Sequence, residues 1–71
     1  IGVNTIVTEL CGNYELWLKI GKVSHHLAAG TKEAIARKHL AVQNFLADKR
    51  LWQYLKTPKD VVIFAARTAS Q

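Results

Sequence analysis

The stretch VNTIVTELCGNYELWLK, residues 3–19, has the clearest hydrophobic pattern in the chain and decides the expected fold. An α-helix advances about 100° per residue, which gathers one set of apolar side chains within roughly 140°: Val3, Ile6, Val7, Leu10, Cys11, Tyr14, Trp17 and Leu18. Outside that arc lie the polar residues Thr5, Thr8, Glu9, Glu15 and Lys19. The pattern predicts an amphipathic helix that begins at Asn4 or Thr5 and buries one face, including Cys11 and Trp17.

A second apolar stripe begins inside this segment and faces another direction. It consists of Leu16, Ile20, Val23 and Leu27. Either the first helix continues past Gly21 and contacts two neighbours, or it ends near Gly21 and a short helix begins at about Ser24. Gly30 is the expected C-cap of that segment, because glycine readily adopts the left-handed conformation that ends helices.

Residues 31–56, TKEAIARKHLAVQNFLADKRLWQYLK, have a helical pattern that begins at Thr31, an N-cap residue. The apolar side chains cluster on one side, but Lys38 and Lys49 project into the same sector. A buried straight helix would not place two lysines there. We therefore expect a break, either within residues 39–41 or at Asp48, which can cap a new helix.

Residues 57–60 give a strong signal for a helix start. Thr57 can cap, Pro58 suits the first helical position and Asp60 suits the first turn. The apolar run VVIFAA at 61–66 fits a buried helix or a strand, and a helix is favoured because no other segment offers a strand partner. The expected fold is all-α, a compact bundle of four or five short helices forming one domain over residues 1–71.

The length and composition of the chain limit the classes of protein to which it can belong. A chain of 71 residues buries only about 60% of its unfolded surface, and Cys11, the single cysteine, has no partner for an intrachain disulfide. The sequence contains no run of 18 apolar residues, so it predicts no membrane span, and we expect a soluble chain. The absence of Met and the start at Ile1 indicate a processed product or an excised domain.

The net charge of +5 points to polyanionic partners. Three or four cations on one surface would bind phosphates by releasing counterions. The alternative is a solvated face whose charges keep the protein soluble. The cations that carry this prediction are Lys32, Arg37, Lys38, Lys49 and Arg50, with Lys56, Lys59 and Arg67 beyond them.

The segment TKEAIARKHLAVQNFL, residues 31–46, resembles the first helix and turn of helix-turn-helix DNA-binding domains. Ile35 and Ala36 match the packing pair of the first helix, and Val42 matches the start of the second. The family usually has glycine in the turn, whereas this chain has residues 39–41, HLA, and one residue too many. The resemblance implies nucleic-acid contacts by Gln43 and Asn44 at base edges and by Lys49 at phosphate. The alternative is an ordinary amphipathic helix with a kink.

Catalytic and metal chemistry have little support in the residue pattern. The five carboxylates are dispersed, and the sequence has neither a triad-like grouping nor a glycine-rich phosphate loop. His25 and His26 would point about 100° apart on a helix, and Cys11 is expected to be buried, so no metal site is predicted. We expect a protein that is not an enzyme and that binds no cofactor.

The leading prediction is a small basic module that binds nucleic acid through a cationic helical surface. The expected contact residues are Arg37, Lys38, Gln43, Asn44, Lys49 and Arg50. One alternative is a processed cationic helical peptide of the bacteriocin or toxin class, with Trp17 and Trp52 as anchors at an anionic membrane surface. Another is a protein-interaction domain or homo-oligomer that covers surplus apolar surface with a second chain.

Overall fold

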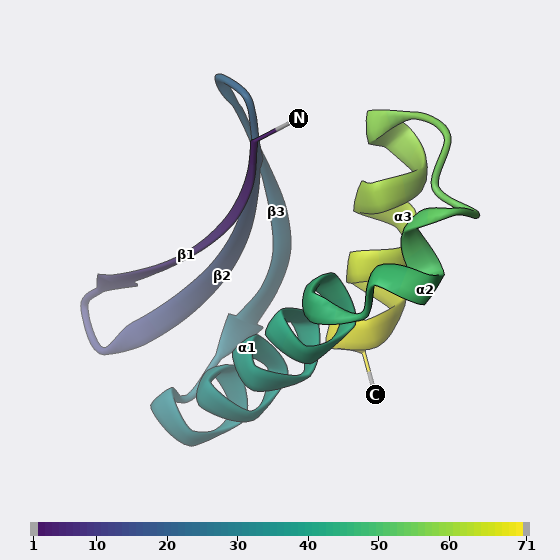
Figure 1. Cartoon of the computed structure of the whole chain (residues 1–71). Helices are drawn as coiled ribbons and strands as arrows, with labels where there is room; N and C mark the ends of the chain where they lie inside the picture. Colours follow the sequence, from purple (N-terminus) through teal and green to yellow (C-terminus); the bar gives the residue numbers. More distant parts are fainter. Residues whose placement is uncertain (1, 71) are drawn as a thin grey trace.

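The computed structural model describes residues 2–70 and shows a three-stranded sheet followed by three helices (Figure 1). The sheet is antiparallel in the order β1-β2-β3, and the helices all lie on one side of it. The fold is therefore α+β, and the prediction of an all-α bundle is wrong. The elements are β1 Val3–Leu10, β2 Asn13–Ile20, β3 Val23–Gly30, α1 Lys32–Ala47, α2 Lys49–Trp52 and α3 Pro58–Ala69.

The predicted first helix is a β-hairpin because the buried residues follow a period of two. Leu16, Leu18 and Ile20 are buried on one face of β2, with Trp17 on the opposite face. The helical arc had placed Trp17 and Leu18 on the same side, which a strand cannot do. Because Trp17 and Leu18 are both apolar, the same stretch fits the apolar stripe of a helix and the alternating faces of a strand.

Two tight turns, ten residues apart, connect the three strands into an antiparallel meander. Cys11 and Gly12 have φ angles of 53° and 81°, the conformation of a type I′ hairpin turn. Gly21, with φ of 60°, begins the second turn. Cys11 is consequently exposed at a loop tip, so its predicted burial is wrong. Gly30 ends β3 and does not cap a helix.

The register divides the sheet into a face covered by helices and an open face. Val3, Thr5 and Val7 lie opposite Ile20, Leu18 and Leu16, so the odd-numbered residues of β1 face the helices. Ile6 pairs with Trp17 on the open face. In β3, Leu27 is an extra residue at a bulge, since Trp17 pairs with His26 and Leu16 pairs with Ala28.

The helix boundaries follow the local capping signals. Thr31 accepts a hydrogen bond from Ala34 N at 3.2 Å, and Asp48 caps α2 by accepting from Arg50 N at 3.1 Å. Thr57 and Asp60 form a reciprocal capping box around Pro58. The predicted break at Asp48 and the predicted helix over 61–66 are confirmed, whereas residues 39–41 lie inside the uninterrupted α1.

The core lies between β2 and the two longer helices. Its fully buried side chains include Leu16 and Leu18 from the sheet and Ile35 and Val42 from α1. From α3 it receives Val61, Ala65 and Ala69. Thr5 Oγ1 of β1 and His39 Nε2 of α1 form a part-buried hydrogen bond of 2.8 Å, which links β1 to α1.

Candidate nucleic-acid interface

The net positive charge of the chain lies entirely in the helical half, residues 31–71. Residues 1–30 contain two cations and two carboxylates, so that half is neutral. Residues 31–71 contain eight cations and three carboxylates, which gives +5, the whole net charge. Because the helices cover one face of the sheet, this excess is concentrated on one layer of the molecule (Figure 1). Lysine and arginine side chains there are exposed except Lys38, which is half-buried.

The acids of the helical half are largely occupied by the backbone. The Asp60 carboxylate accepts hydrogen bonds from the backbone N–H groups of Lys56 and Thr57, each at 3.2 Å. Asp48 caps α2 and binds Arg50. Within residues 2–70, Arg50 is the only lysine or arginine with a carboxylate within 4 Å. The other cations of the layer thus present their charge to solvent.

α1 does not display the predicted contact residues as one set. Arg37 and Asn44 are seven residues apart, so they share an exposed stripe on the outer side of the helix. Gln43 is exposed but is turned about 100° from Asn44. Lys38 is half-buried on the stripe that also carries Phe45, which stacks on α3. The structure therefore groups Arg37 with Asn44 and separates Gln43 and Lys38 from them.

The helix-turn-helix arrangement is absent from the described residues, because α1 runs through residues 39–41 without a turn. Val42, expected to open a recognition helix, is fully buried in the core. The helical stripe of buried side chains extends across the supposed turn, from Ile35 to Val42. The implied contacts of Gln43 and Asn44 with base edges thus lose the geometry on which they rested.

The two cations of α2 have different environments. Lys49 is exposed and has no carboxylate partner within residues 2–70. Arg50 donates from Nε and Nη2 to the two oxygens of Asp48, each at 3.2 Å. These hydrogen bonds lower the pKa of Asp48 and raise that of Arg50. Lys49 is therefore available for an external phosphate, whereas Arg50 already has an anionic partner.

An aromatic cleft of about 120 Å³ opens between the three helices of this layer. Its lining includes Phe45 of α1 and Phe64 of α3, whose rings stack with centroids 6.3 Å apart and planes 20° apart. Tyr54 also lines the cleft and is 67% exposed. We define the aromatic cleft by its lining residues, Phe45, Leu51, Tyr54, Leu55 and Phe64.

Arg67 brings a positive charge to the aromatic cleft. Its guanidinium carbon lies 5.7 Å from the centre of the Phe64 ring, within the range of a cation–π contact. Phe64 itself remains 38% exposed. From the sequence, Arg67 was expected only as one of the cations beyond Arg50, without a connection to Phe64. Their spacing of three residues on α3 is the signal that would have found the pair.

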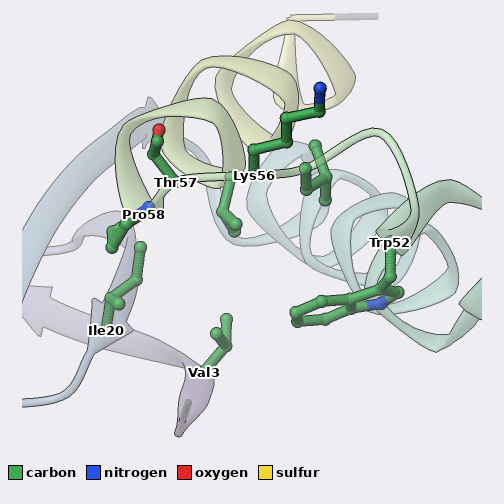
Figure 2. Close-up of a pocket in the computed structure, with 8 residues that line it drawn as sticks. Val3, Ile20, Trp52, Lys56, Thr57 and Pro58 are labelled. Carbon is green, nitrogen blue, oxygen red and sulfur yellow. The ribbon is translucent and has the colours of Figure 1, made fainter.

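A second hollow, of about 180 Å³, lies where the ends of β1 and β2 face the segment between α2 and α3 (Figure 2). Figure 2 shows the Trp52 ring reaching toward Val3 and Ile20, with the amino group of Lys56 pointing away. The indole Nε1 donates to Leu46 O at 2.8 Å. Trp52 is thus half-buried, with its polar atom satisfied inside the protein.

The open face of the sheet carries the other tryptophan. Trp17 Nε1 donates to Thr8 Oγ1 at 2.9 Å, and the ring contacts His26 edge-on with centroids 5.0 Å apart. His26 Nε2 lies 3.8 Å from a Glu15 carboxylate oxygen. Trp17 is therefore held on the face opposite the core, and its predicted place in the core is wrong. This face lacks the positive excess of the helical layer.

The described residues provide neither a cluster of metal ligands nor a helix that could span a membrane. His26 lies beside Trp17 on the open face of the sheet, whereas His39 is hydrogen-bonded to Thr5 on the face that the helices cover. Within residues 2–70 no three histidine, cysteine or carboxylate side chains gather as metal ligands. Over the same residues, no helix combines the length and hydropathy that crossing a bilayer would require.

Comparison of the chain with protein-family models, with curated proteins and with solved structures found no match.

Proposed function

We propose that the protein binds nucleic acid through the outer surface of its helical layer. The observation that supports this function best is the division of charge: the helical half has a net charge of +5, and the sheet half has a net charge of zero. Exposed cations on one side of a folded domain attract phosphates and release condensed counterions. Arg37, Lys49 and Arg67 are the proposed phosphate contacts, because each is exposed and has no carboxylate partner within residues 2–70.

The aromatic cleft favours single-stranded nucleic acid over a duplex. Unpaired bases stack on exposed aromatic rings, and each such contact contributes about 1–3 kcal/mol. Tyr54 and Phe64 present partly exposed rings in the layer that carries the charge. A base pair inside a duplex offers neither of its faces to such a ring. The proposed ligand is therefore an unpaired stretch of DNA or RNA.

The test is a fluorescence titration of a labelled single-stranded oligonucleotide at about 50 mM and about 200 mM salt. We expect binding that weakens steeply at the higher salt concentration. Replacing Arg37, Lys49 and Arg67 together by glutamine should reduce the affinity at least about tenfold at low salt, since three phosphate contacts are lost. The matched control replaces Lys19 and Lys22 of the sheet half by glutamine and should retain most of the affinity.

Two results would reject the proposal: no binding at low salt, and equal losses in the helical and sheet variants. Binding to duplex as tight as to single strands would overturn the proposed preference for unpaired strands and, with it, the role of the aromatic cleft. A parallel dye-leakage measurement with anionic vesicles separates this function from the membrane alternative, because leakage without oligonucleotide binding would favour the cationic-peptide class.

A further inference from the structure

The outer edge of β1 has the properties of a protein interface. The order β1-β2-β3 leaves β1 and β3 as the edges of the sheet. β3 contains the bulge at Leu27, which hinders pairing with another strand. β1 is eight residues long, has an uninterrupted register with β2, and carries Glu9 as its single charged residue. Of the two edges, β1 is therefore the more regular template for a further strand.

The hydrogen-bond register shows which backbone groups of β1 face outward. Gly21 N donates to Gly2 O at 3.0 Å, so the Gly2–Gly21 pair belongs to the hydrogen-bonded set. Hydrogen-bonded pairs alternate along an antiparallel ladder, so the even-numbered residues of β1 bond to β2. The outward N–H and C=O groups therefore belong to Val3, Thr5, Val7 and Glu9. Within residues 2–70 no strand pairs with this side.

A groove of about 230 Å³ lies beside this edge, between the sheet and α1. Its lining combines Val7 and Tyr14 of the sheet with Ile35, Ala36, Lys32 and His39 of α1. Val7 is 39% exposed and Leu10 is 74% exposed. A strand added to β1 would direct alternate side chains over the groove. The backbone edge and the groove therefore offer hydrogen bonds and apolar contact to the same incoming strand.

We propose that β1 pairs antiparallel with β1 of a second copy, joining two three-stranded sheets into one of six strands. In such a pairing, the residues whose backbone N–H and C=O groups face outward must lie opposite one another. The register that uses all four of these residues places Ile6 opposite Ile6 of the second copy. Val3 then faces Glu9 and Thr5 faces Val7, twice each. No like charges meet, and the side chains of Val3 and Thr5 from the second copy lie over the groove.

Charge favours this edge over the helical layer as the contact between copies. The sheet half is neutral, so two β1 edges approach without net repulsion. Two helical layers, each carrying +5, would repel one another. The two-fold axis stands perpendicular to the joined sheet, which leaves both helical layers on the same side of the dimer.

The first experiment is sedimentation velocity on the full chain without nucleic acid, over a range of protein concentrations. We expect a species of twice the chain mass at the higher concentrations. Val7→Pro removes one outward N–H, keeps the bonds between β1 and β2 and should sediment as a monomer with an unchanged circular dichroism spectrum. A chain that is monomeric throughout, or a folded Val7→Pro variant that still dimerises, would overturn the proposal.

A cross-linking experiment decides the register and does not depend on the proline variant folding. Ile6→Cys is made in a Cys11→Ser chain. Opposite Ile6 residues form a non-hydrogen-bonded pair, with Cα atoms about 4.5 Å apart, which suits a disulfide. Mild oxidation should yield covalent dimer much faster than in the matched Ser24→Cys control, whose cysteine lies on the opposite edge strand. Equal yields would overturn the proposed register. Because no nucleic acid is present, these results are independent of the proposed binding function.

Discussion

The sheet half and the helical half of this protein contrast in charge while sharing one core. Residues 1–30 are neutral, and residues 31–71 carry +5. Yet both halves contribute to the core, with three buried residues from β2 and five from α1 and α3. Packing and charge are therefore distributed independently in this molecule. The sheet provides three of these eight buried residues and the proposed interface edge, whereas the helices provide the other five and the cationic surface.

The largest effect is expected from the shared core. Leu18→Ala removes a side chain that is fully buried between β2 and the helices. We expect a loss of about 2–5 kcal/mol in the free energy of unfolding, from lost transfer energy and a residual cavity. Urea denaturation measures it, and the neighbouring exposed Lys19→Ala is the control. A change in Leu18→Ala no larger than in Lys19→Ala would show that the sheet does not share the core as described.

The aromatic cleft should show the next largest effect, which sharpens the contrast in binding function. Tyr54→Ala removes the most exposed ring of the cleft. If single strands bind as proposed, their binding free energy should fall by about 1–3 kcal/mol. Tyr54→Phe preserves the ring and should bind nearly as well. Oligonucleotide titration distinguishes the two, and an undiminished affinity in Tyr54→Ala would exclude stacking at this cleft.

A turn in the neutral half should respond in the opposite direction. Cys11 has φ of 53°, a left-handed conformation that costs a residue with a Cβ atom roughly 1–2 kcal/mol. Asn–Gly is the favoured pair for this turn, so Cys11→Asn should stabilise the protein by about 0.5–1 kcal/mol. Thermal and urea unfolding measure the gain. A lower stability, with Cys11→Ser unchanged, would contradict the turn geometry.

The smallest effect concerns the Asp48–Arg50 pair of the helical half. Asp48→Asn keeps an N-cap residue and frees the Arg50 guanidinium for phosphate. We expect the affinity for single strands to rise about two- to threefold at low salt. Glu33→Gln, which removes the same charge without freeing an arginine, should raise it less. Equal gains would mean that only net charge matters.

The same pair has a defined pH dependence. Hydrogen bonds from Arg50 lower the pKa of Asp48 below its ordinary value of 3.8. A carboxyl group whose pKa is lower in the folded state stabilises the fold above the unfolded pKa and loses that contribution as pH falls through the folded value. The pair should therefore contribute fully above about pH 5 and weaken below about pH 4. Comparing Asp48→Asn with the parent chain in acid measures this small contribution.

Local signals in the sequence predicted the helix boundaries and part of the candidate site. The caps at Thr31, Asp48 and Thr57 depend on hydrogen bonds spanning only two or three residues, so neighbouring residues suffice to identify them. The excess of cations in residues 31–71 is likewise a property of composition. Arg37, Asn44 and Lys49 remain exposed as predicted, but sequence spacing could not show that Lys38 packs partly into the layer or that Asp48 pairs with Arg50.

The helix caps followed from the sequence because each depends on residues two or three positions apart, and the net charge followed from composition. The turns at Gly12 and Gly21 and the strands β1 and β2 did not, since the apolar pattern of residues 3–20 fits both periods and the outcome depends on distant partners such as His39, which contacts Thr5. Tertiary structure also placed Trp17 on the open face and Phe64 beside Phe45. Strand pairing and side-chain packing between remote segments set these positions. The free energy of that pairing and packing outweighs the local preference of a segment for helix or strand.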